Sequence, residues 1–147
     1  DEGRVVLAFG RLLNGDVDGA LAKLVEVNVE VSPFALAARA TALAIIGDRD
    51  GALADVVAVE AMDSVSYWDL AIAQVAGAVA ASGDEAVRRR RDLQGLADSL
   101  EDVVVVSYAA DVMRRLDANG EESSRPSDLP TGGWRSVAEL LVPAPQL

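Results

Sequence analysis

The sequence contains no cysteine and no histidine, and these two absences exclude several kinds of chemistry. Without cysteine the chain can form neither a disulfide nor a thiolate metal site. Without histidine it lacks the commonest general base and the commonest metal ligand. The sequence also has no glycine-rich phosphate loop and no carboxylate pair whose spacing suggests a shared cleft. We therefore predict that the chain is not an enzyme and binds no cofactor or metal.

Aromatic residues and lysine are scarce as well. The 147 residues include two each of Phe, Trp and Tyr but 26 Ala and 21 Val, so the apolar fraction of 51% consists mainly of small side chains. This composition favours helices that approach closely, with alanine at their contacts. A single lysine accompanies 12 arginines, which indicates a gene from a bacterium rich in G and C.

Charge and hydropathy limit the classes of partner. The net charge of −11 argues against nucleic acid and against an anionic membrane surface, because both require a basic footprint. The longest apolar run without charge, Leu70–Ser82, is shorter than the roughly 18 residues of a membrane span. No secretory signal is visible. We expect a cytoplasmic location.

A turn rich in glycine and aspartate recurs along the chain. The stretch Leu13–Leu21 (LNGDVDGAL) returns as Ile46–Leu53 (IGDRDGAL) after 32 residues, and a shorter version, Ser82–Val87 (SGDEAV), follows after another 36. Recurrence at a period of 20 to 50 residues is typical of repeat architectures, in which each unit is too small to bury its own apolar face.

Apolar residues between these turns recur at helical spacing. Glycine after a helix and aspartate before the next one support the same boundaries, because they favour the C-cap and N-cap conformations. The sequence therefore predicts helices over residues 4–13, 20–25, 35–46, 52–62, 66–81, 85–100, 102–116 and 134–141.

Two valine-rich stretches leave the type of element open. Val25–Val31 alternates as a strand does, and Val103–Val106 is a β-branched run. Either stretch could be helical or extended. We favour helix, or helix followed by an extended link, because an isolated strand has nothing to pair with.

Two amphipathic helices joined by Gly-Asp-x-Asp-x-Ala-Leu, at a period of about 34 residues, resemble the tetratricopeptide repeat. The resemblance implies an all-α fold, with antiparallel helical hairpins stacked as a short right-handed α-solenoid of about seven helices plus a closing helix. It also implies a domain that binds other proteins. The small residue of the first helix, the turn glycine and the alanine of the second helix match at Ala8, Gly15, Ala20, Ala40, Gly47, Ala52, Ala76, Gly83 and Ala86.

The chain is expected to divide into three parts. Residues 1–118 form the repeat domain. Residues 119–133, rich in Gly, Ser, Pro and Glu, form a flexible linker loop. Residues 134–147 form a capping helix and tail.

Two polar motifs have structural interpretations that we prefer to functional ones. Asn14–Gly19 matches the start of a calcium loop, but Val25 stands where that loop needs a bidentate Glu. We expect Asp16 or Asp18 to cap a helix instead. The run Arg88–Arg91 fans around a helix and cannot converge on one ligand. We expect it to form an ion-paired face, with at least one arginine turned toward a neighbouring segment.

The predicted function is protein–protein interaction or intramolecular regulation, within a larger bacterial regulatory protein. The partner would be another protein, another domain or a second copy of the chain. The alternative is a small-molecule-sensing domain with an apolar pocket. We expect Tyr67, Trp68 and Trp134 to belong to the core. Helical register places the candidate partner-binding face at Val5, Phe9, Leu12, Ala37, Arg39, Thr41, Ala44, Ala73 and Gly77.

That face is apolar, and large apolar patches are seldom left exposed. We expect a partner helix, the 134–141 segment or a second copy of the chain to cover it.

Overall fold

The computed structural model describes residues 2–25, 32–99, 103–117 and 133–142. Regular structure in these residues is entirely helical, which confirms the all-α prediction. Val103–Val106 lies in a helix, whereas residues 26–31 fall outside the described part of the chain. The helices are α1 (Glu2–Leu13), α2 (Val17–Val25), α3 (Pro33–Ile46), α4 (Arg49–Glu60), α5 (Tyr67–Ala80), α6 (Gly83–Ser99), α7 (Val103–Asp117) and α8 (Gly133–Leu141).

The helix ends follow from local side-chain chemistry. The Gly51 amide donates to the Asp48 carboxylate at 3.0 Å, which caps α4. The Asp69 amide donates to the Ser66 hydroxyl at 3.1 Å, which caps α5. Gly47 closes α3 at a φ of 88°, in the left-handed region that glycine adopts without strain. The predicted turn residues therefore set these boundaries.

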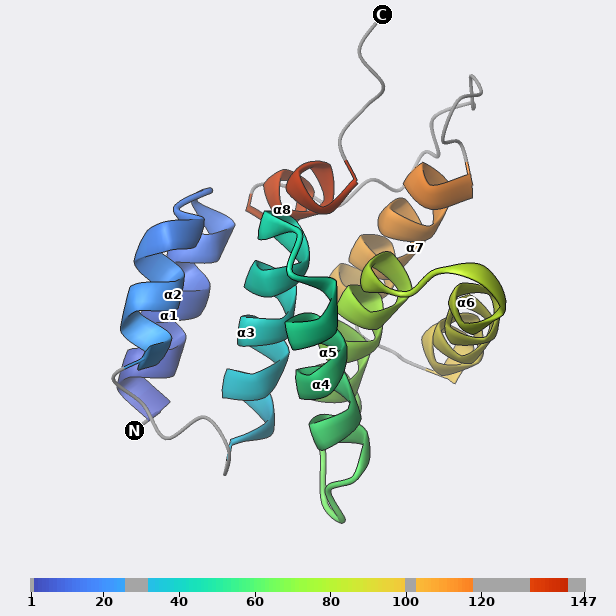
Figure 1. Cartoon of the computed structure of the whole chain (residues 1–147), viewed down its shortest axis with the longest axis horizontal. Coiled ribbons are helices and arrows are strands. Elements are labelled where there is room, and N and C mark those ends of the chain that lie inside the picture. Colours follow the sequence, from blue (N-terminus) through green and yellow to red (C-terminus); the bar gives the residue numbers. More distant parts are fainter. Residues whose placement is uncertain (1, 26–31, 100–102, 118–132, 143–147) are drawn as a thin grey trace, which may run out of the picture.

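The helices form two layers and one closing element (Figure 1). In the first layer α1 packs against α3, α3 against α5, and α5 against α7. In the second layer α2 packs on α1, α4 packs on α3 and α5, and α6 packs on α5 and α7. The short helix α8 lies between the α1–α2 pair and α7, next to one end of α3, and contacts α1, α3 and α7.

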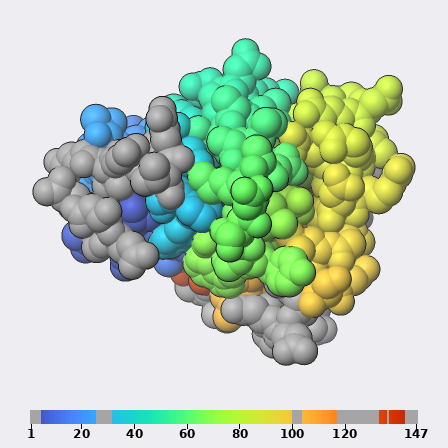
Figure 2. Space-filling view, turned by 90° about the horizontal axis from the view of Figure 1, so that it is seen from below, coloured from blue at the N-terminus to red at the C-terminus, as the bar shows by residue number. Residues whose placement is uncertain are grey.

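Small side chains fill the space between the layers. Ala40, Val56 and Ala76, from α3, α4 and α5, form a compact apolar cluster with no exposed surface. A larger cluster, mostly aliphatic, contains residues from all eight helices, with Leu93 as the contribution of α6. Figure 2 shows the molecule from below, with α4 in green and α6 in yellow. The alanine-rich composition thus allows the close helix contacts that the sequence predicted.

No helix in the described ranges has the length and the apolar character needed to cross a membrane.

Candidate functional site

One aromatic side chain from each of α1, α5 and α7 meets the aromatic side chain of α8. The ring centroid of Trp134, on α8, lies 5.3 Å from that of Phe9 and 5.1 Å from that of Tyr108. It also stands 5.8 Å from the Trp68 ring at an interplanar angle of 90°. Edge-to-face pairs of this kind contribute about 0.5–1.5 kcal/mol beyond area burial. Phe34 of α3 completes the cluster, at 5.2 Å from Phe9.

The cluster confirms that Trp68 and Trp134 pack against the core. The prediction was wrong for Tyr67, the sixth aromatic residue, which is the first residue of α5 and is exposed. In a chain so poor in aromatic residues, the meeting of the other five at one place marks that place as the structural centre of the first layer.

The apolar face of α8 is buried against the first layer. Val137, Ala138 and Leu141 follow Trp134 at helical spacings of three, four and seven residues, and all three are buried. These side chains pack with the large core cluster, which also contains residues of α1, α3 and α7. The chain's own C-terminal segment, one of the three coverings that we expected, packs against α1, α3 and α7.

The first residue of α8 sits tightly against the end of α1. A Cβ atom at Gly133 would lie 2.5 Å from the Leu13 Cβ and 2.6 Å from the Leu13 carbonyl oxygen. Real Cβ atoms do not approach other heavy atoms that closely, so only glycine fits at this contact. Residue 133 was expected to belong to a linker, whereas the structure makes it part of the docked helix.

The polar edge of α8 contacts α7. The Glu139 carboxylate forms an ion pair with the Arg115 guanidinium of α7 at 3.7 Å. It forms a second ion pair, at 3.3 Å, with Arg135, which lies one turn earlier on α8. Arg115 also pairs with Asp111 at 3.2 Å. The Asp111 side chain is fully buried, and the same oxygen atom pairs with Arg114 at 2.7 Å. α8 is therefore held by apolar contacts on one side and by a charged contact on the other.

Tyr108 lies in the same region with an unsatisfied hydroxyl group. Its side chain is buried, and its hydroxyl has no hydrogen-bond partner among the described residues. Burial raises the pKa of the Tyr108 phenol above its ordinary value. We did not select Tyr108, Asp111 or Arg115 from the sequence. Their spacing of three and four residues, which puts them on one face of α7, was the available signal.

The nine residues predicted to form the partner-binding face lie mostly inside the chain. On α1, Val5 and Leu12 are buried in the large cluster, and Phe9 contacts Trp134. Ala37 and Ala73 are fully buried in the same cluster. As the chain is folded here, these side chains are not accessible to a partner.

Three other predicted residues turn out to serve the contact between the layers. Arg39 binds Asp55 of α4 through two hydrogen bonds of 2.7 Å. A Cβ atom at Gly77 would meet Arg89 and Val56, which belong to the second layer. Ala44 packs at the border of both apolar clusters. Small side chains surround these helices on several sides, so apolar character alone could not tell the two faces apart.

The last of the nine, Thr41, is buried, and its hydroxyl donates to the Ala37 carbonyl oxygen at 2.9 Å.

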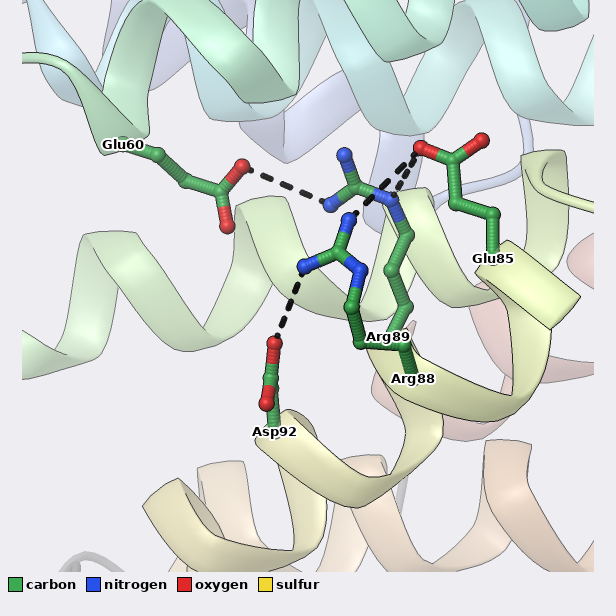
Figure 3. A network of polar contacts seen from close by, with 5 residues as sticks. All are labelled: Glu60, Glu85, Arg88, Arg89 and Asp92. Carbon is green, nitrogen blue, oxygen red and sulfur yellow. Dashed lines mark hydrogen bonds and ion pairs between the residues drawn. The ribbon is translucent and has the colours of Figure 1, made fainter.

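Two arginines of the α6 run, Arg88 and Arg89, form ion pairs, as predicted for this face (Figure 3). Arg89 turns inward with only 5% of its side chain exposed, and its guanidinium contacts Glu85 at 3.2 Å and Glu60 of α4 at 3.4 Å. Arg88 stays at the surface and pairs with Asp92 at 3.3 Å. The inward arginine therefore ties α6 to α4.

The Asp16 carboxylate is engaged in local structure. It accepts from the Gly19 amide at 2.9 Å and from Arg11 at 3.0 Å. These hydrogen bonds lower the pKa of Asp16, the amide contributing most. In the part of the chain that the structure describes, no cluster of three or more acidic side chains is arranged to hold a metal ion.

The candidate functional site is therefore the face of the first layer together with α8. It combines an aromatic cluster, an apolar helix contact and a charged edge at Arg115. Neither a family model, nor a curated protein, nor a solved structure matches this chain.

Proposed function

We propose that this chain is a protein-interaction module whose first helical layer binds an amphipathic helix. Helix α8 occupies the binding face when no partner is present, so the same face serves intramolecular regulation. The observation that carries this proposal is the position of Trp134, which contacts rings from α1, α5 and α7 at once. Helices laid into apolar grooves are commonly recognised through anchors at spacings of three, four and seven residues.

The packing order of the helices supports a tetratricopeptide-like solenoid. Each first-layer helix contacts the next one along the chain, and each second-layer helix packs on the first-layer helix that precedes it. Stacking of this kind gives extended binding surfaces in helical repeat proteins. We propose that the first layer lines the inner face of a short right-handed stack.

The short length of α8 and its connection to α7 are suited to a helix that a partner can displace from the binding face. A helix of nine residues is marginal by itself, so its order depends on contacts with the first layer. The 15 intervening residues, 118–132, can span at most about 50 Å. A tether of this length gives an effective concentration on the order of millimolar. Binding of moderate intrinsic affinity is then sufficient to keep α8 docked.

A peptide-binding experiment tests the proposal. A fluorescent peptide of residues 133–142 is titrated onto the full chain and onto its Trp134→Ala variant, whose own α8 has lost its anchor. We expect saturable binding to the variant with a Kd of about 100 µM, and at least tenfold weaker binding to the unchanged chain. Circular dichroism confirms that the variant keeps its helix content.

The control is a peptide that itself carries Trp134→Ala. Absence of saturable binding to the variant chain would contradict the proposal, and so would equal binding of the two peptides.

A further inference from the structure

The edge of the binding face at α7 holds an arginine whose charge is only partly matched within its own helix. Arg115 is largely buried, with 14% of its side chain exposed, and it shares a single Asp111 oxygen with Arg114. A second carboxylate reaches it from α8, where Glu139 lies 3.7 Å away. When α8 leaves the face, this second carboxylate leaves with it.

The sequence of α8 shows which register the face accepts. Taking Trp134 as the first anchor, aliphatic side chains follow at the third and seventh positions after it, and a small one at the fourth. Glu139, at the fifth position, is half exposed and pairs with Arg115 at the rim. The apolar anchors and the carboxylate therefore occupy fixed positions relative to one another.

Building on the proposed function, we propose that the partner is an amphipathic helix with an aromatic anchor and a carboxylate five residues after it, which pairs with Arg115. The apolar anchors supply most of the binding free energy, because exposed ion pairs contribute little. The carboxylate discriminates among amphipathic helices. A helix with the same apolar stripe and a lysine at that position would place two cations together at the rim.

The net charge of the chain makes the position of the carboxylate on a partner helix important. The chain carries a net charge of −11, so its overall field repels acidic helices. Arg115 places a positive charge at one defined point of the binding face, where a carboxylate is attracted. An acidic partner therefore has to place its carboxylate in register with the aromatic anchor, since a general attraction does not hold it.

A double-mutant cycle on the full chain tests this inference. The Trp134→Ala chain is titrated with two peptides of residues 133–142, one unchanged and one carrying Glu139→Gln. The measurement is repeated on a chain that also carries Arg115→Gln. We expect the Gln peptide to bind about 3–5-fold more weakly than the Glu peptide to the first chain, which is the upper range for an exposed pair. On the second chain we expect the difference to fall to about twofold or less, because only the Arg135 pair within the peptide then distinguishes Glu from Gln.

Arg91→Gln provides the matched control, because Arg91 is an exposed arginine on α6. This variant should retain the full preference for the Glu peptide. Salt gives an independent measurement that needs no change at Arg115. Raising NaCl from 50 to 500 mM should bring the two affinities together on the first chain, because screening weakens exposed pairs.

The outcomes separate this inference from the proposed function. If the unchanged peptide does not bind at all, the helix-binding function itself is contradicted. If it binds through Trp134 but the Gln peptide binds equally well, the face binds helices and the carboxylate rule is wrong. A preference for Glu that is undiminished in Arg115→Gln, or that salt does not reduce, also overturns the role of Arg115.

Discussion

Gly77 shows at the scale of one residue how the two layers fit together. It lies on α5 under the Arg89 side chain, and a Cβ atom there would stand 3.1 Å from the guanidinium and 3.2 Å from a Val56 methyl. We expect Gly77→Ala to lower the free energy of unfolding by about 1–2 kcal/mol, because the crowding outweighs the helix propensity of alanine. Urea unfolding measures the change.

Gly95 offers the matched control, since a Cβ atom there meets nothing within 4 Å. The Gly95→Ala variant should be about 0.5–1 kcal/mol more stable than the unchanged chain. Equal stabilisation by both substitutions would show that a Cβ atom at residue 77 does not crowd the Arg89 side chain.

The buried Tyr108 hydroxyl predicts a specific dependence of stability on pH. Burial raises the pKa of Tyr108 in the folded chain, whereas an unfolded tyrosine has a pKa of about 10. The folded chain therefore holds the phenolic proton more tightly. This contribution to stability is fully present below about pH 10 and is lost as the pH rises above it, by up to about 1.4 kcal/mol per pH unit.

The Tyr108→Phe variant should lack this loss above pH 10. At pH 7 it should be as stable as the unchanged chain or about 1 kcal/mol more stable, because an unpaired buried hydroxyl is removed. Unfolding curves at pH 7 and pH 10.5 measure both effects. Clear destabilisation at pH 7 would mean that the hydroxyl has a partner.

At this scale the sequence predicted the capping residues well and the direction of side chains less well. The caps at Asp48 and Ser66 depend on neighbours three residues away, so local sequence determines them. The direction of Arg39 depends on Asp55, which lies 16 residues away on another helix. Long-range pairing of this kind cannot be deduced from a single helical stripe.

The element at the centre of the proposed function is α8, and we expect its docking to depend on the glycine at its first position. Gly133→Ala would place a Cβ atom against Leu13 while improving the intrinsic helix propensity of α8. We expect this variant to release α8 from α1, so that its amides exchange hydrogen at least about tenfold faster. Amides of α3 and α5 should keep their exchange rates.

Gly10→Ala on α1 is the control, because a Cβ atom there meets nothing within 4 Å. It should leave the exchange of α8 unchanged. If α8 keeps its protection in Gly133→Ala, the close contact with Leu13 does not hold the helix in place.

The recurring turns predicted most of the helices. The choice between helix and strand stayed open for the valine-rich stretch of α7, and its packing shows why. β-branched residues favour strands in general. In α7, however, Val105, Tyr108 and Val112 follow one another at helical spacing and are all buried. Packing against the core therefore overrides the local preference of Val103–Val106. The amphipathic character of α8 was visible in the sequence, but its docking site was not, because an apolar stripe fits many faces.

At the scale of the whole molecule, α8 joins the two ends of the first layer. It contacts α1, the first helix of that layer, and α7, the last (Figure 1). The aromatic cluster lies where these contacts meet. A partner that displaced α8 would therefore change the contacts at both ends of the stack in one step.

The absence of cysteine makes a direct distance measurement possible. Spin labels are attached to cysteines introduced by Ala22→Cys on α2 and Arg135→Cys on α8, and the distance distribution between them is measured in the full chain. Our account predicts one narrow distribution, which becomes broad when Trp134→Ala is added. A broad distribution in the chain with intact Trp134, or a narrow one that Trp134→Ala leaves unchanged, would contradict the claim that α8 occupies a helix-binding face through its tryptophan.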